Sequence, residues 1–334
     1  MYDVITLGET MLRFTPADGQ RIEQATQFDL HIGGSESNTA AGLARLGHRV
    51  AWLSRLTDNA LGRKLAAAIS AHGVDTQHIL WTNQDRIGTY YFEPGTPPRN
   101  SQVIYDRCNS SFSRYSAEML PANLFAIGTA RLLHVTGISL ALGTICQSMI
   151  DKSIQLARDA GWKISFDVNY RAKLWSLDEA ASKCRETIQK SDVVIMPIRD
   201  ARAIFKSGPE SQPVENDPTE SARQTLEDLS RMTNAECIVL TLGRFGAAAH
   251  AKGRFHFQPT APVELPVGRL GGGDAFSAGF LSAWLESGQA EIGLRRGNAA
   301  AGLKYSVPGD LPYFTREEVL SLENCSANHT QYFR

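Results

Sequence analysis

The residues best suited to chemistry lie in the segment 268–288, which reads GRLGGGDAFSAGFLSAWLESG. Apolar residues recur after Asp274 with the spacing of one buried helical face, which predicts a helix there. Gly271, Gly272 and Gly273 therefore precede a helix N-terminus, where backbone N–H groups and the helix dipole favour a bound anion. A carboxylate beside a phosphate is repelled, so we expect Asp274 to remove a proton from an attacking hydroxyl. The alternative is a helix-start carboxylate after a tight glycine turn.

A second helix that follows two glycines is expected in the segment 33–62, which begins GGSESN. Asn38 lies one turn into this helix. Its amide is both a donor and an acceptor of hydrogen bonds, which suits a sugar hydroxyl group. The alternative for Asn38 is a capping or turn residue. A P-loop, a G-x-G-x-x-G run after a strand, H-E-x-x-H and G-x-S-x-G are all absent, which argues against the enzyme classes that use them.

Short apolar strands alternate with amphipathic helices, which is typical of a mostly parallel sheet. The expected strands are 3–8, 49–54, 131–136, 163–168, 192–196 and 236–242. The expected helices are 35–46, 61–72, 141–160, 199–206 and 218–232. Residues 207–219 contain three prolines and predict a surface loop, and 323–334 predict a polar tail.

Two segments, 11–32 and 86–115, interrupt this pattern with β-rich stretches and predict a small accessory sheet. Ile87, Tyr91, Val103 and Tyr105 supply alternating apolar residues, on a sheet too small to bury both faces alone.

Composition limits the class of protein. The 334 residues include 34 Lys and Arg against 35 Asp and Glu, a net charge of −1, which removes the argument for nucleic-acid or membrane-surface binding. The five cysteines are far apart and never form C-x-x-C, so a disulfide framework or a thiolate metal site is not expected. The first residues lack the features of a signal peptide, and no apolar run is long enough for a membrane span. We therefore expect a cytoplasmic protein.

The two glycine-led segments together resemble the signatures of the ribokinase-like (PfkB) carbohydrate kinases, with GG…N near the N-terminus and GGGD for the usual GAGD. The resemblance extends along the whole chain. It implies one ribokinase-like domain over 1–334, a three-layer αβα sandwich with a mostly parallel sheet, and a β-sheet lid from 11–32 and 86–115. It also implies ATP and Mg²⁺, with Asp274 as the base and the three glycines as the anion hole. The residues implied near ATP are Thr241, Gly243, Arg244, Gly246 and, beside the adenine, Asn298.

Within this family, GGSESN, IGTYYFEPG, VIYDR and DVNYRAKLW resemble the 2-keto-3-deoxygluconate kinases. The implied reaction is phosphorylation of the sugar acid at O6. The implied substrate residues are Gly34, Asn38, Tyr90, Tyr105, Arg107 and Arg171. A substrate carboxylate needs a cation, and arginine offers a planar pair of donors. The alternatives are a surface charge or a structural salt bridge for each arginine, and a fructokinase or a non-catalytic sugar sensor for the protein.

The sequence departs from the family pattern at two places that concern ions. Gly268 stands six residues before Asp274, where the family commonly has an aspartate of a monovalent-cation site, so dependence on potassium is doubtful. The family's N-x-x-E motif, linked to magnesium, is replaced by PIRD at 197–200, in which Asp200 is the candidate for an indirect contact to Mg²⁺ through water. The resemblance further implies a homodimer or higher oligomer assembled through the lid.

Overall fold

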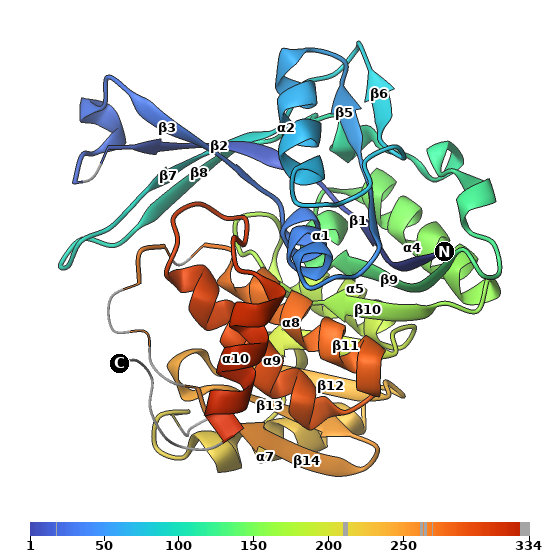
Figure 1. Cartoon of the computed structure of the whole chain (residues 1–334), viewed down its shortest axis with the longest axis vertical. Coiled ribbons are helices and arrows are strands. Elements are labelled where there is room, and N and C mark those ends of the chain that lie inside the picture. Colours follow the sequence, from blue (N-terminus) through green and yellow to red (C-terminus); the bar gives the residue numbers. More distant parts are fainter. Residues whose placement is uncertain (18, 210–212, 261–262, 264–265, 269, 328–334) are drawn as a thin grey trace.

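The computed structural model describes residues 1–334 except 18, 210–212, 261–262, 264–265, 269 and 328–334 (Figure 1). At its centre is an eight-stranded sheet in which six neighbouring strands, β12, β11, β10, β9, β1 and β4, are parallel. At one edge, β13 pairs antiparallel with β12, and β14 pairs antiparallel with β13. The spatial order is β14 (Arg254–Gln258), β13 (Ala247–Ala251), β12 (Cys237–Thr241), β11 (Val193–Pro197), β10 (Lys163–Asp167), β9 (Ala130–Thr136), β1 (Tyr2–Leu7) and β4 (Val50–Leu53).

Successive residues of the central strands enter two different hydrophobic clusters, one on each face of this sheet. In β11, Val193 and Ile195 belong to one cluster, whereas Val194 and Met196 belong to the other. Because both faces are covered, these strands are apolar throughout instead of alternating with polar residues. This explains why the sequence shows them as short continuous apolar runs.

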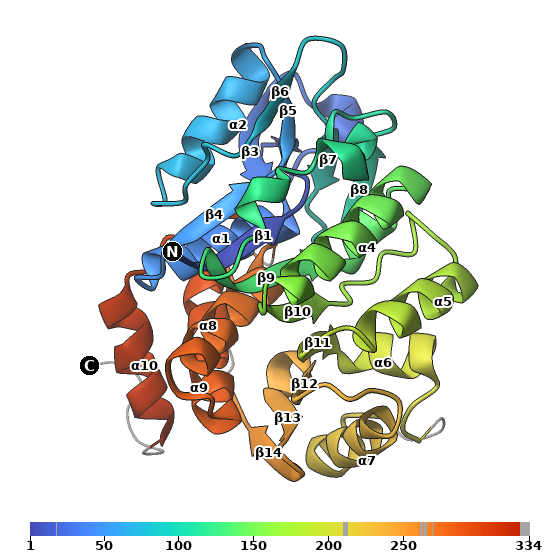
Figure 2. The same ribbon diagram turned by 90° about the vertical axis from the view of Figure 1, so that its right-hand side faces the viewer.

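Helices cover both faces of the sheet and give a three-layer α/β/α arrangement (Figure 2). One face carries α1 (Ser35–Arg45), α2 (Ala60–Ser70), α8 (Gly272–Ser287) and α9 (Ala290–Tyr305), with α10 (Arg316–Ala327) packed on α9. The other face carries α4 (Thr144–Asp159), α5 (Leu177–Ile188), α6 (Ile198–Phe205) and α7 (Pro218–Ser230). Within the described residues, no helix has both the length and the apolar character needed to cross a membrane. The cytoplasmic location stays a prediction.

A second, four-stranded sheet extends from one side of the main body (Figure 1). Its order is β3 (Phe28–Gly33), β2 (Met11–Pro16), β7 (Thr89–Glu93) and β8 (Gln102–Asp106). Its strands come from the two segments that interrupt the α/β pattern, as the sequence predicts. A two-stranded parallel sheet, β5 (Arg55–Thr57) with β6 (Leu80–Thr82), lies between them along the chain. Short 3-10 turns are η1 (Ile22–Gln24), η2 (Phe112–Arg114), η3 (Ala117–Met119), η4 (Ala122–Leu124) and η5 (Gly243–Phe245).

Three expectations about elements need correction. The helix expected over 141–160 is α4, which begins only at Thr144, after a separate short helix α3 (Gly137–Leu140) that was not expected. The helix α5 was not predicted from the sequence either. The polar tail expected from residue 323 begins too early, because α10 continues to Ala327. Glu323 is buried there and accepts a hydrogen bond from Arg296 Nε at 2.7 Å. Its polar side chain therefore belongs to an internal ion pair and not to an exposed tail.

Helices α8 and α9 are in unusually close contact because glycines occur where they cross. A Cβ atom at Gly279 would lie 2.6 Å from the Arg296 carbonyl oxygen, and one at Gly297 would lie 2.8 Å from the Phe276 ring. This close contact holds the beginning of α8 against the end of α9. It therefore determines where the glycine run at 271–273 lies.

We predict that Gly279→Ala lowers the stability of the protein, although alanine favours a helix by about 1 kcal/mol over glycine. The added methyl group would force the two helices apart, and such overpacking typically costs about 1–3 kcal/mol. The matched control is Gly302→Ala in α9, where nothing lies within 4 Å of an added Cβ. Thermal unfolding without ligands should give a lower Tm for the first variant and an equal or higher Tm for the second. The opposite order would show that the crossing can relax.

Candidate active site

The glycine run lies at the N-terminus of α8, as the sequence predicts. Gly271 caps the helix with φ 76°, in the left-handed region, and an added Cβ would overlap the carbonyl oxygen of Asp310. At Gly272 a Cβ would overlap the ring of Tyr305, whereas nothing lies within 4 Å of one at Gly273. The first turn of a helix has N–H groups without intrahelical acceptors. The first turn of α8 is thus tightly packed at Gly271 and Gly272 and open at Gly273, where backbone N–H donors can reach a ligand.

Asp274 is held by two side chains of α1. Its Oδ1 accepts a hydrogen bond from Ser35 Oγ and its Oδ2 accepts one from Asn38 Nδ2, both at 2.7 Å. Ser35 in turn accepts a hydrogen bond from Asn169 Nδ2 at 2.7 Å. Burial raises the pKa of Asp274, and the hydrogen bonds from Ser35 and Asn38 partly oppose that rise. A raised pKa makes this carboxylate a stronger base.

Ser35 and Asn169 belong to the site but were not predicted from the sequence. Ser35 belongs to the same GGSESN segment as Asn38, and the spacing of three residues puts both on one side of the first turn of α1. That spacing was a usable signal. Asn169 is 134 residues from Ser35 in the chain, with φ 38°, and no local pattern indicates their contact.

Two more aspartates lie at the C-terminal edge of the sheet, where ligands of α/β folds bind. Asp167 ends β10 and Asp200 lies in the first turn of α6, after β11; both are buried. Burial, followed by the negative charge of Asp274, raises the pKa of Asp167 to about 7. Burial also raises the pKa of Asp200. The site therefore concentrates negative charge that a cation would stabilise.

The two arginines implied at the sugar end have different surroundings. Arg107 is buried, and its Nε and Nη2 both donate to Glu9 Oε2, the former at 2.9 Å. This is the structural salt bridge that the sequence left open. Arg171 is half-buried and donates to the Tyr170 carbonyl oxygen at 3.1 Å. Among the described residues, no carboxylate oxygen lies within 4.0 Å of its guanidinium, yet its charge lowers the pKa of Asp167, Asp200 and Asp274.

The small sheet contributes tyrosines to the same region. Tyr90 on β7 and Tyr105 on β8 are paired in register, with ring centroids 5.9 Å apart. The Tyr90 hydroxyl donates to Asp310 Oδ1 at 2.6 Å, and Arg13 Nε lies 3.1 Å from the other oxygen of Asp310. Asp310 was not predicted from the sequence, because it lies in an irregular segment after α9 with no periodic pattern. It joins the small sheet to the loop that packs on the glycine run.

Gly34 lies where β3 meets α1. A Cβ at this position would overlap the Glu9 carbonyl oxygen and lie 2.9 Å from Thr10 Cα. Gly34 caps α1 with an extended φ of −164°. Glycine is therefore needed here because the backbone passes very close to residues 9 and 10, which follow β1. This close approach brings the start of α1 beside the Arg107–Glu9 pair.

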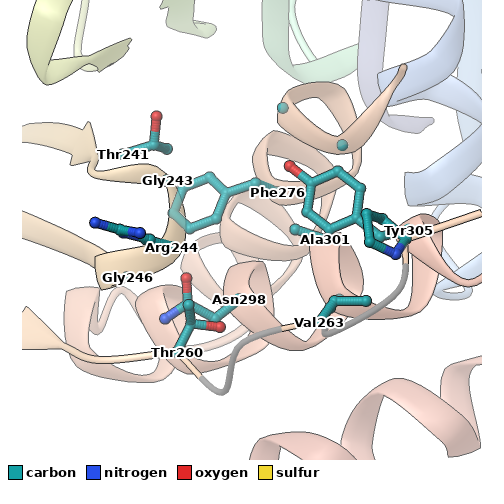
Figure 3. Close-up of a pocket in the computed structure, with 14 residues that line it drawn as sticks. Thr241, Gly243, Arg244, Gly246, Thr260, Val263, Phe276, Asn298, Ala301 and Tyr305 are labelled. Carbon is teal, nitrogen blue, oxygen red and sulfur yellow. The ribbon is translucent and has the colours of Figure 1, made fainter. Parts of the chain in front are cut away.

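A separate pocket of about 380 Å³ lies beside the glycine run (Figure 3). This volume is within the usual range for small-molecule sites. Its walls include Phe276 and Tyr305 from α8 and α9 (Figure 3). The pocket collects all of the residues implied near ATP and two of the glycines, namely Thr241, Gly243, Arg244, Gly246, Asn298, Gly272 and Gly273. Asn298 Nδ2 is 3.2 Å from the Gln258 carbonyl oxygen, which orients its amide.

The residues around Asp200 suit a magnesium ion that arrives with a nucleotide. One Asp200 oxygen accepts the Tyr170 N–H at 3.1 Å, and the other lies 3.4 Å from Arg199 Nε. Across the described chain, no three His, Cys, Asp or Glu side chains are grouped to hold a metal. Magnesium commonly keeps several waters and binds phosphates with only one or two carboxylates. Asp167 and Asp200 fit that need.

Comparisons with known proteins agree with this geometry. The model of the "pfkB family carbohydrate kinase" matches residues 1–312. A 2-dehydro-3-deoxygalactonokinase of Haloferax volcanii is 35% identical over 317 residues, which cover 95% of each chain. The crystal structure of a 2-dehydro-3-deoxygluconokinase from Thermotoga maritima has a TM-score of 0.89 and 29% identity, covering 97% of this chain and 100% of that one.

The fold is shared more widely than the sequence. The structure of a putative ribokinase II from E. coli is only 18% identical but has a TM-score of 0.82, covering 97% of this chain and 99% of that one. Both structures have the large mostly parallel sheet and the helices found here, so the fold is ribokinase-like. Together with the family match along nearly the whole chain, this shows that the protein belongs to the pfkB family of carbohydrate kinases.

Proposed function

We propose that this sugar kinase transfers the γ-phosphoryl group of ATP to O6 of 2-keto-3-deoxygluconate (2-dehydro-3-deoxy-D-gluconate). The observation that supports this most is the position of one helical turn. Gly272 and Gly273 line the pocket of Figure 3, while the Asp274 side chain is hydrogen-bonded to Ser35 and Asn38 of α1, which do not line that pocket. A nucleotide in the pocket and a sugar beside α1 would meet at this turn.

In the proposed reaction, Asp274 accepts the proton of the sugar hydroxyl as its oxygen attacks the γ-phosphorus. The bond from that phosphorus to the ADP oxygen breaks, and the N–H groups of Gly271–Gly273 stabilise the charge on the transferring group. Ser35 and Asn38 orient the carboxylate through its two hydrogen bonds. A magnesium ion bound with ATP, near Asp167 and Asp200, would neutralise phosphate charge.

The nucleotide side of the proposal uses the pocket residues. Thr241, Gly243, Arg244 and Gly246 form its edge at the end of β12 and the η5 turn. Asn298 and Ala301 lie on α9, where we place the adenine. The Arg244 guanidinium offers a positive charge to the phosphates, and the glycines leave room for the backbone to approach them.

The sugar side is proposed to bind a carboxylate through Arg171. The charge of this guanidinium lowers the pKa of Asp167, Asp200 and Asp274, but none of these carboxylates is within ion-pair distance of it in the described structure. Arg107 keeps N–H donors beyond those used by Glu9 and could bind the acid as a second contact. Gly34, Asn38, Tyr90 and Tyr105 complete the proposed site. The names of the Haloferax and Thermotoga relatives, which refer to two such acids, favour this substrate class.

The rival functions differ in what they turn over. A fructokinase would phosphorylate a neutral ketose and would have no use for the Arg171 charge. A sensor would bind a sugar without transferring phosphate. A coupled ADP-release assay of the wild-type protein with 2-keto-3-deoxygluconate, its C4 epimer and fructose separates the three. We expect turnover with the acids, and turnover with none of the sugars would favour the sensor.

We predict that Asp274→Asn removes phosphoryl transfer while ATP and sugar still bind. The amide keeps the size of the side chain but cannot accept the proton. Loss of a positioned general base typically lowers kcat about 10²–10⁴-fold. Steady-state kinetics measure kcat, and calorimetric titrations measure both ligands. A variant with near wild-type kcat would exclude Asp274 as the base.

For the sugar acid, Arg171→Ala should lower kcat/KM about 10–150-fold, because a charge-assisted hydrogen bond contributes about 1.5–3 kcal/mol. The same change should matter much less for any activity on fructose, which has no carboxylate. Kinetics on both substrates measure the difference. Equal losses on both would make Arg171 a structural residue and remove the main support for a sugar acid.

Two control variants sharpen this comparison. Arg63→Ala removes an exposed arginine of α2 and should leave both activities unchanged. Arg107→Ala leaves the buried Glu9 carboxylate without its partner, which typically costs about 3–5 kcal/mol of stability. Its Tm should therefore fall well below that of Arg171→Ala, because Arg171 has no such ion pair among the described residues.

We also propose that two copies of the chain pack through the outer face of the small sheet. The register places Phe14, Leu30, Tyr91 and Ile104 on that face, and Leu30 and Ile104 are 40% and 44% exposed. Of the four apolar residues noted in the sequence, only Tyr91 lies there. Val103 and Tyr105 are on the opposite face with Tyr90, and Ile87 is buried.

The expected mass of the wild type by light scattering is a multiple of 36.6 kDa. Ile104→Asp would put a charge into the proposed apolar interface and should give single chains. Ile127→Asp is the matched control, because Ile127 is 86% exposed at another place and should keep the wild-type mass. A wild type that is a single chain at working concentration would rule out the assembly.

A further inference from the structure

Lys304, in the last turn of α9, is a charged side chain with no exposed surface. Its Nζ donates to the Val307 carbonyl oxygen at 3.2 Å. Lysine is rarely buried completely, because the ammonium loses its hydration. Burial accordingly lowers the pKa of Lys304 to about 8. Because burying this charge lowers the stability of the fold, we expect a function that depends on it.

The charges that face Lys304 come from four different parts of the fold. Asp310 in the following loop and Asp274 on α8 favour its charged form, whereas Arg13 on β2 disfavours it. His31 on β3 also faces it, and its pKa is lowered by burial, by Arg13 and by Lys304. The ammonium is therefore placed among the groups that join the small sheet to the start of α8.

The loop that Lys304 holds supports the glycine run. Gly271 packs directly on the backbone of Asp310. Gly268 passes the same loop, and a Cβ there would lie 3.3 Å from the Val307 carbonyl oxygen. That oxygen is the acceptor of the Lys304 ammonium. One carbonyl group thus connects the lysine with the position where the family commonly has an aspartate for a monovalent cation.

This arrangement does not fit a free potassium ion. Position 268 has no carboxylate, and a fixed ammonium already binds the adjoining carbonyl, so a second cation would be repelled.

We propose that the Lys304 ammonium replaces that monovalent cation and positions the Gly271–Asp274 turn by holding the loop at 306–310. Lys304 is a positioning residue in this scheme and does not touch the substrate. The inference rests on the phosphoryl transfer proposed above. It makes the wild-type enzyme independent of added potassium, with the cation supplied by the chain itself.

The test compares the wild type with Lys304→Met, with and without potassium, at equal ionic strength kept with tetramethylammonium. Potassium should not change the wild-type kcat or Tm. Lys304→Met, which keeps most of the side chain but removes the charge, should lose about 10²-fold in kcat, as expected for a displaced reacting group. Potassium or methylammonium should restore part of that loss. Lys252→Met, at an exposed lysine that also donates to a carbonyl oxygen, should behave as the wild type.

A second variant builds the missing carboxylate. Gly268→Asp combined with Lys304→Met should gain both kcat and Tm when potassium is added, because the pair creates a cation site. A wild type that requires potassium would overturn the proposal, and this result does not depend on whether any variant folds. A folded Lys304→Met with full kcat in the absence of potassium would also overturn it, as would a loss that no cation restores in either variant.

The Tm measurements test this inference independently of which sugar is the substrate. If 2-keto-3-deoxygluconate is not phosphorylated, the substrate proposal fails, and the kcat arms are measured on the sugar that is turned over. The response of Tm to potassium needs no sugar. A potassium-induced rise in the wild-type Tm would contradict the tethered cation even if the sugar acid proves to be the substrate.

Discussion

Both oxygens of Asp274 accept hydrogen bonds from the first turn of α1, a helix more than 200 residues away in the chain. This contact requires the N-termini of α1 and α8 to lie side by side above the C-terminal edge of the sheet. A Cβ at Gly42 would be 2.6 Å from the Ala278 side chain, so the two helices touch farther along as well. The carboxylate is thus oriented before any ligand binds, which is the condition for efficient proton transfer.

The same contact divides the site into two chemically different halves. On one side, the pocket between β12, α8 and α9 is lined by small residues and by the rings of Phe276 and Tyr305. On the other side lie buried aspartates, Arg171 and the tyrosines of the small sheet. Two of the arginines on this second side are already paired, since Glu9 neutralises Arg107 and Asp310 neutralises Arg13. Arg171 is the cation left for a ligand in our account.

Local patterns were sufficient for the parts of the structure that depend on local physics. A glycine run before apolar residues at helical spacing predicted the start of α8, and continuous apolar runs predicted the parallel strands. The helix α5 was missed because its buried face is small, consisting of Ala180, Cys184, Thr187 and Ile188. Contacts between distant residues could not be predicted this way. The Glu9–Arg107 pair spans 98 residues and Tyr90–Asp310 spans 220, so neither leaves a periodic signal.

The proposed activity has a direct chemical signature. Phosphorus NMR of the wild-type protein with ATP and 2-keto-3-deoxygluconate should show a new phosphomonoester signal, coupled to the two protons at C6, that grows as ADP forms. Fructose in place of the acid should give a much slower signal. A phosphomonoester that forms as fast with fructose, or one attached to another carbon of the acid, would contradict the account.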